Sequence, residues 1–92
     1  MKLSGNISQE ELEEVAKRLI LSKKGEYKYY DLLKEYQTMF DDSVQILKVH
    51  SSLVLAMDDL LWQGFVKYNN KKSVYENIEI NKEKSEEELV NG

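Results

Sequence analysis

The sequence contains no cysteine and no proline. The absence of cysteine excludes disulfides, thiolate zinc sites and a thiol nucleophile. No apolar run approaches the roughly 20 residues that a transmembrane helix needs, and the opening MKLSGNIS lacks the apolar core of a secretory signal. We therefore expect no membrane segment and a cytoplasmic location.

Residues that carry catalysis or bind metals are also scarce. His50 is the single histidine, so no cluster of histidine and cysteine with metal-ligand spacing exists, and no glycine-rich phosphate loop is present. The pairs Asp41/Asp42 and Asp58/Asp59 are consecutive, which turns their side chains about 100° apart on a helix. We expect no catalytic residue, no metal, no cofactor and no enzymatic activity.

The remaining composition is that of one small globular domain. The 92 residues are 41% hydrophobic and 33% charged, with a formal net charge of -4, and a chain of this length has apolar area for a single modest core. Residues 82–92 (KEKSEEELVNG) are poor in apolar residues and rich in glutamate. We predict a domain over residues 1–81 and a disordered charged tail over residues 82–92.

Two helices are indicated in the first half of the chain. Ser8 and Glu11 fit a capping box, and apolar residues at helical spacing then predict a helix over residues 8–23 that ends before Gly25. Residues 26–28 are predicted as an extended link or a one-bridge strand. A second amphipathic helix is predicted over residues 29–39.

The third helix is predicted over residues 43–63, with Asp41 or Asp42 as its N-cap. Weak helix formers at 50–52 leave a second possibility open, in which the helix restarts near Ser51 and Ser52. Gly64 is expected to end this helix, because glycine readily adopts the positive φ of a helix C-terminus.

A β-hairpin is predicted directly after Gly64. In the predicted register, Val66 lies opposite Val74 and Tyr68 lies opposite Lys72, with residues 69–71 at the tip, where an asparagine takes the left-handed conformation. One face of this hairpin is then expected to cover the helices. The residues of that face are Val66, Tyr68, Val74, Ile78 and Ile80.

The order helix, link, helix, helix and hairpin resembles the winged helix-turn-helix family. The resemblance is carried by SSLVLAMDDLLWQGFVKY, residues 51–68, in which a helix of spaced apolar residues ends at glycine before an aromatic residue and the first wing strand. It covers residues 7 to 80. It implies a mostly α fold with a small β-hairpin (α+β), built from three helices plus a C-terminal two-stranded wing.

The resemblance also implies a DNA-binding surface, because the third helix of this family lies in the major groove and the wing contacts the backbone. The exposed early helix positions would be Ser43, Val44, Gln45, Leu47 and Lys48, or residues from His50 if the helix restarts. We predict a small transcriptional regulator that binds double-stranded DNA as a dimer. The predicted DNA-binding residues are Gln45, Lys48, Ser51, Ser52, Lys67, Lys71 and Lys72.

Several residues favour an alternative function. The only arginine, Arg18, lies in the first helix, and Asp41 and Asp42 would place negative charge near phosphates. The wing lysines would also serve solubility and block edge pairing, and the tyrosines are better explained by packing than by base stacking. Val54, Leu55 and Trp62 lie off the apolar stripe that the third helix would bury. They either fill a second layer under the first helix or the tail, or form an exposed patch that marks a protein interface, most simply a homodimer; we favour the interface. The alternative is a winged-helix protein–protein interaction module or an accessory subunit of a nucleic-acid-processing assembly.

Overall fold

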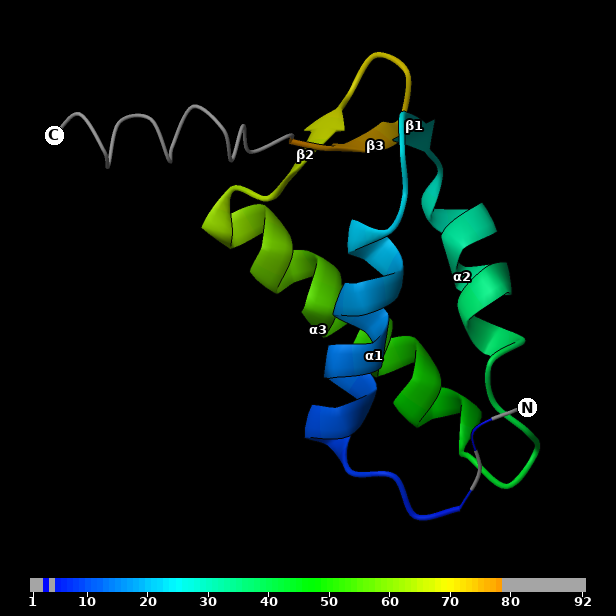
Figure 1. Ribbon diagram of the computed structural model, residues 1–92. Coiled ribbons are helices and arrows are strands. Elements are labelled where there is room, and N and C mark those ends of the chain that lie inside the picture. Colours follow the sequence, from blue (N-terminus) through cyan, green and yellow to red (C-terminus); the bar gives the residue numbers. More distant parts are fainter. Residues whose placement is uncertain (1–2, 4, 79–92) are drawn as a thin grey trace, which may run out of the picture.

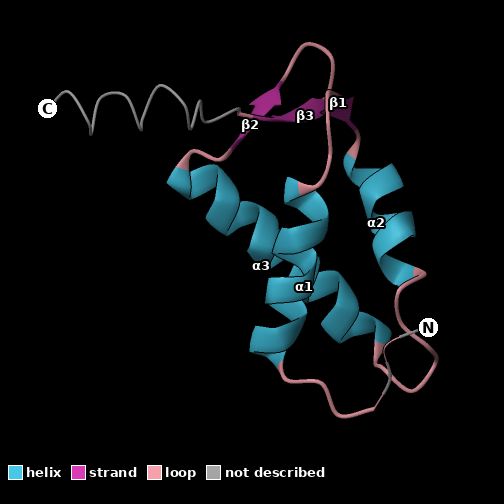
Figure 2. Ribbon diagram, viewed as in Figure 1, coloured by secondary structure: helices cyan, strands magenta, loops and turns pink. Residues whose placement is uncertain are grey.

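The computed structural model describes residue 3 and residues 5–78. The helices are α1 (Gln9–Leu21), α2 (Tyr29–Gln37) and α3 (Ile46–Gln63), and the strands are β1 (Glu26–Tyr27), β2 (Val66–Asn69) and β3 (Val74–Asn77). The small sheet lies at one end of the helices (Figure 1), and helices and strands are distinguished in Figure 2. The α+β fold of three helices and a hairpin is therefore as predicted. The predicted tail, residues 82–92, lies outside the described residues.

α1 forms where the capping pattern predicts a helix. The Ser8 side-chain Oγ accepts a hydrogen bond from the Glu11 amide at 3.2 Å, which satisfies one of the unpaired N–H groups of the first turn. Gly25 follows the helix with a φ of 72°, in the left-handed region that glycine adopts at low cost. The buried positions of α1 are Leu12, Ala16 and Ile20.

α3 begins three residues later than predicted. Its N-cap is Gln45, which makes no side-chain capping hydrogen bond, so the prediction of Asp41 or Asp42 as the cap is wrong. The Asp41 carboxylate instead accepts from the Ser43 amide at 2.9 Å, and the Ser43 hydroxyl accepts from the Gly5 amide at 2.8 Å. Residues 41–44 are thus held in a turn that ties the N-terminal segment to the start of α3.

α3 then continues through Ser51 and Ser52 without a break, so the possible restart at this point is wrong. Serine destabilises a helix interior when its hydroxyl competes for backbone groups outside the helix. Here both hydroxyls bond back within it: the Ser51 Oγ lies 3.2 Å from the Lys48 carbonyl oxygen, and the Ser52 Oγ lies 2.8 Å from that of Val49. The two serine hydroxyls therefore bond to carbonyl oxygens of α3 itself and do not interrupt the helix.

The hairpin has a different register from the predicted one. Val66 pairs with Asn77 and Tyr68 pairs with Tyr75, and the tip consists of residues 70–73. The left-handed residue of the tip is Ser73, with a φ of 56°, rather than an asparagine. Because paired residues share a face, Val66 and Val74 point to opposite faces, and the predicted common face is wrong. Ile80 lies outside the described residues.

The sheet has three strands rather than two. β1 pairs antiparallel with β3, so the strand order is β1-β3-β2. Asn77 at the end of β3 fixes the sheet to α1: its side-chain amide donates to the carbonyl oxygens of Ile20 at 2.8 Å and Lys23 at 3.0 Å and accepts from the Tyr27 hydroxyl at 2.6 Å. Of the two possibilities predicted for residues 26–28, an extended link or a one-bridge strand, the strand is observed, with two residues paired to β3.

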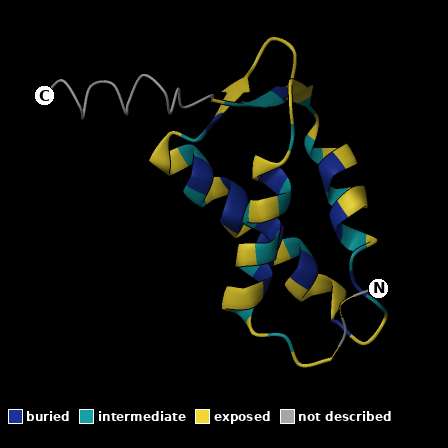
Figure 3. Cartoon of the chain, viewed as in Figure 1, coloured by how far each residue is buried: buried dark blue, intermediate teal, exposed yellow. Residues whose placement is uncertain are grey.

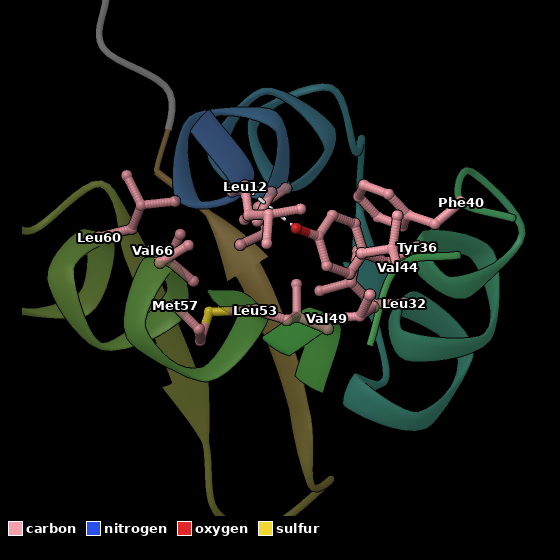
Figure 4. Close-up of a cluster of buried hydrophobic side chains, with 13 residues drawn as sticks. Leu12, Leu32, Tyr36, Phe40, Val44, Val49, Leu53, Met57, Leu60 and Val66 are labelled. Atoms are coloured by element: carbon pink, nitrogen blue, oxygen red, sulfur yellow. Dashed lines mark hydrogen bonds between the residues drawn. The ribbon is translucent and has the colours of Figure 1, made fainter. Parts of the chain in front are cut away.

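The core lies between the three helices and is closed at one end by Val66 of β2. Figure 4 shows side chains from α1, α2, α3 and β2 pointing into one cluster. α3 ends at Gly64, whose φ of 83° turns the chain so that β2 packs against the helix it follows. The position of the hairpin beside the C-terminus of α3 therefore depends on this glycine.

Candidate interaction surfaces

The side of α3 that faces away from the core is apolar. Its residues recur at three- and four-residue intervals and lie along one side of the helix. We call this surface the α3 face; it consists of Leu47, Ser51, Val54, Leu55, Asp58 and Trp62. Trp62 is 90% exposed, Leu47 is 78% exposed, and Val54 and Leu55 are each 46% exposed. Exposed positions alternate with buried ones along α3 in Figure 3.

The buried side of α3 is also apolar, because it supplies the core. Val49, Leu53, Ala56, Met57 and Leu60 are all buried on that side. A surface helix of a globular protein normally places polar residues opposite its buried stripe. α3 places four large apolar side chains there instead, with Ser51 and Asp58 as the polar members of the face.

Three predicted interface residues, Val54, Leu55 and Trp62, all lie on the α3 face. Leu47 was predicted among the exposed positions of a DNA-facing helix; in the structure it extends the same apolar face by two turns. The spacing of these residues in the sequence already indicated that Leu47 shares their face. Leu47 and Val54 are seven residues apart, as are Leu55 and Trp62, and seven residues span about two helical turns.

The predicted DNA-binding residues at the start of α3 do not share one environment. Gln45, Lys48 and Ser51 are exposed. Ser52 is fully buried and its hydroxyl lies 2.8 Å from that of Tyr36, so the prediction that Ser52 contacts DNA is wrong. Val44, predicted to be exposed, is also buried, because residues 41–44 form a turn against the core.

The wing lysines are exposed, but two of them face carboxylates of the same sheet. The Lys67 ammonium lies 3.1 Å from the Glu76 carboxylate, and the Lys72 ammonium lies 3.4 Å from that of Glu26. At the hairpin tip, the Asn69 side-chain oxygen accepts from the backbone amides of Lys71 at 3.0 Å and Lys72 at 3.2 Å. Exposed ion pairs contribute only about 0–1 kcal/mol, so these pairs lower the positive potential of the wing without fixing the lysines rigidly.

A groove of about 710 Å³ separates the end of α2 from the start of α3, and Asp41 and Asp42 are among its lining residues. The N-terminus of a helix favours anions, since its amide groups carry partial positive charge. The two carboxylates beside the first turn of α3 oppose that effect. A phosphate placed against this end of α3 would meet negative charge.

Four of the six tyrosines, Tyr27, Tyr29, Tyr68 and Tyr75, gather on the sheet and its margin. The Tyr75 ring lies 4.7 Å from the Tyr68 ring and 6.1 Å from the Tyr27 ring, measured between centroids. Tyr27, Tyr29 and Tyr75 are partly buried against the core. Burial raises the pKa of Tyr27 to about 12, with a smaller contribution from Tyr75. These three rings therefore pack the sheet onto the helices.

One ion pair joins α1 to the flank of α3. Lys17 donates to the Asp59 carboxylate, which also accepts from the Gln63 side chain at 2.8 Å. The hydrogen bond from Lys17, followed by that from Gln63, lowers the pKa of Asp59. The same bond raises the pKa of Lys17. Asp59 is therefore engaged by its own chain, whereas Asp58 points to the α3 face.

His50 contacts the side chain of Gln37, so it joins α3 to α2. Over residues 5–78, no group of three histidine, cysteine, aspartate or glutamate side chains is placed to hold a metal ion. The contact with Gln37 gives His50 a packing role.

Comparison of the chain with models of protein families, with curated proteins and with solved structures finds no match. None of the described helices combines the length and apolar character needed to cross a membrane. Function is therefore inferred from the surfaces of the described residues.

Proposed function

We propose that the chain is a winged-helix-type domain that works as a protein–protein interaction module, with the α3 face as its docking surface. The observation that carries this proposal is the row of exposed apolar side chains on α3, from Leu47 to Trp62. A single exposed apolar residue is ordinary on a protein surface. Four of them on one helix face are a concentration of exposed apolar side chains, which is typical of an interaction site.

Burial of this patch supplies the driving force for binding. Removal of apolar surface from water is worth about 25 cal/mol per Å², and tryptophan is among the residues that dominate interface energies. Trp62 is 90% exposed and makes the largest single contribution available on the α3 face. The surrounding Val54 and Leu55 would exclude water from its contact with a partner.

The order of elements supports the winged-helix layout. The hairpin follows α3 directly at Gly64, and β1 between α1 and α2 joins the hairpin as a third strand. In DNA-binding members of that family, the helix equivalent to α3 inserts into the major groove. Here the exposed side of that helix is apolar, so the same surface is better suited to a protein than to phosphates and base edges.

Double-stranded DNA is the second candidate partner, and the exposed Lys48 and Lys71 favour it, since neither faces a carboxylate in the described residues. Phosphate neutralisation by lysine and arginine supplies most non-specific affinity for DNA. The formal net charge of -4 and the ion pairs of Lys67 and Lys72 weigh against it. We therefore rank the protein-interaction function first.

Photocrosslinking in an extract of the source cells tests this function. The full chain would carry p-benzoylphenylalanine in place of Trp62, or, as a matched control, in place of Tyr30, an aromatic residue that is 65% exposed on α2. We expect a protein adduct from position 62 and far less from position 30, because only position 62 lies on the α3 face. Equal yields at both positions, or an adduct to nucleic acid alone, would contradict the proposal.

A salt titration separates the two candidates. The purified chain would be titrated with random-sequence duplex DNA at about 50 and about 200 mM salt. The interaction function predicts no binding up to about 100 µM, whereas micromolar binding that weakens with a log–log slope of several ions would move DNA to first place.

A further inference from the structure

We infer that the occupant of the α3 face is a second copy of this chain, bound through antiparallel packing of the two α3 helices about the midpoint between Val54 and Leu55. This inference rests on the proposed function, since it names the partner of the same surface. It is supported by the order of residues along the face and by the placement of its charges.

The α3 face is self-complementary when it is reversed about that midpoint. Leu47 then lies opposite Trp62 of the second copy, and Val54 lies opposite Leu55 of the second copy. Trp62, the largest residue of the face, thus meets the smaller Leu47 at each end of the interface. Val54 and Leu55 meet in the middle. A two-fold interface requires this kind of match, because the same patch serves both subunits.

Charge distinguishes the antiparallel arrangement from the parallel one. In a parallel pair, Asp58 would face Asp58 of the second copy, and two carboxylates would be enclosed among apolar side chains, which is strongly unfavourable. In the antiparallel pair, Asp58 lies opposite Ser51 of the second copy, whose hydroxyl is a hydrogen-bond donor. Antiparallel packing therefore removes the one electrostatic conflict of the face.

Lys48 adds to this complementarity. It is exposed and makes no ion pair within the described residues. After the reversal, the first turn of α3 lies beside the last turns of the other α3, so Lys48 is about one helical turn from Asp58 of the second copy. Lys48 of each copy is thus brought near Asp58 of the other copy, once at each end of the interface.

The α3 face is small, so we expect the dimer to be weak. A stretch from Leu47 to Trp62 is about 22 Å long at 1.5 Å per residue. One helix from each copy gives an interface at the lower end of specific complexes. We expect dimerisation with a dissociation constant on the order of micromolar.

Sedimentation equilibrium of the full chain over about 1 to 500 µM tests self-association. Trp62 is the only tryptophan, so its emission reports directly on the interface. We expect the mass to rise from monomer to dimer while the emission moves to shorter wavelength. Leu55→Lys should weaken association by about thirtyfold or more, and Tyr30→Lys on exposed α2 should leave it unchanged. A monomer throughout this range would overturn the inference.

Disulfide formation tests the antiparallel arrangement, because the chain has no cysteine of its own. Ser51→Cys and Asp58→Cys leave every apolar residue of the face in place. In the antiparallel dimer, a mixture of the two variants should form a disulfide, since residues 51 and 58 lie opposite each other. Either variant alone should not, because identical positions are then about 10 Å apart along the helices, beyond the reach of a disulfide.

The other outcomes distinguish failure of the antiparallel packing, of the second copy as partner, and of the interaction function itself. Disulfides between two copies of the same variant, without a mixed disulfide between residues 51 and 58, would overturn the antiparallel packing. A monomeric chain that forms a photoadduct from position 62 to a different protein would overturn the second copy as partner while the interaction function stands. A monomeric chain without any protein adduct would overturn both.

Discussion

The hydroxyl oxygens of Tyr36 and Ser52 lie 2.8 Å apart in the centre of the core, where both residues are fully buried. The Tyr36 hydroxyl also donates to the Leu12 carbonyl oxygen at 2.8 Å. Because the Tyr36 hydrogen goes to Leu12, the single hydrogen of the Ser52 hydroxyl can be donated either to the Tyr36 oxygen or to the Val49 carbonyl oxygen, which also lies 2.8 Å away. This group of polar contacts joins α3, α2 and α1. This arrangement explains why a serine occupies the buried side of α3.

We predict that Tyr36→Phe lowers the free energy of unfolding by about 1–3 kcal/mol, because it leaves buried polar groups of Ser52 and Leu12 with fewer partners. Urea denaturation followed by circular dichroism measures the change. Tyr30→Phe is the matched control, since Tyr30 is exposed on the same helix, and it should change stability by less than about 0.5 kcal/mol. Similar losses in the two variants would contradict the role of the buried hydroxyl.

Asn77→Ala should destabilise the fold by about 1–3 kcal/mol, because it removes the hydrogen bonds to Tyr27, Ile20 and Lys23 that fix the sheet to α1. Thermal and urea unfolding would measure the effect. Asn70→Ala at the exposed hairpin tip is the control and should be nearly neutral. An unchanged midpoint for Asn77→Ala would show that the sheet is held by other contacts.

Tyr27 should ionise near pH 12, because its pKa is raised to about 12 chiefly by burial. An ultraviolet titration of the wild type and of Tyr27→Phe isolates its contribution. The unfolded chain loses this proton near pH 10 and the folded chain holds it longer, so Tyr27 makes stability fall as pH rises from about 10 to about 12. Tyr27→Phe should flatten that part of the stability profile.

The pKa of Asp59 should lie below its ordinary value of 3.8, because Lys17 and Gln63 donate hydrogen bonds to the carboxylate. Its contribution to stability is present above that ordinary value and is lost as pH falls through the lowered pKa. An NMR titration of the carboxyl carbon measures this. Lys17→Met should move the pKa of Asp59 upwards, while Lys24→Met, at an exposed position, should not.

Reversal of charge at the hairpin tip separates the wing from the α3 face. Lys71→Glu combined with Lys72→Glu should leave dimerisation of the chain unchanged, because neither residue belongs to that face. The same double variant would weaken DNA binding if the second candidate function holds. Sedimentation and a DNA titration on one preparation give both results.

The three helices were predictable, apart from the start of α3, because the signals that set them are local. The Ser8 cap, the apolar periodicity of α1 and α2, and the glycine at position 64 each act within a few residues. The position of Val54, Leu55 and Trp62 off the buried stripe of α3 also followed from the sequence, and the structure decided between a second packed layer and an exposed surface. The surface that carries the proposed function was therefore visible, apart from Leu47.

The tertiary structure alone decided the hairpin register, the third strand and the burial of Ser52. Each depends on partners far away in the sequence: Asn77 meets the end of α1, β1 pairs with β3, and Ser52 meets Tyr36. Local pattern fixes which residues are apolar, but a shift of a strand by one residue reverses its faces at little local cost. Only contacts between distant segments remove that freedom, so these features emerged when the helices and the sheet packed together.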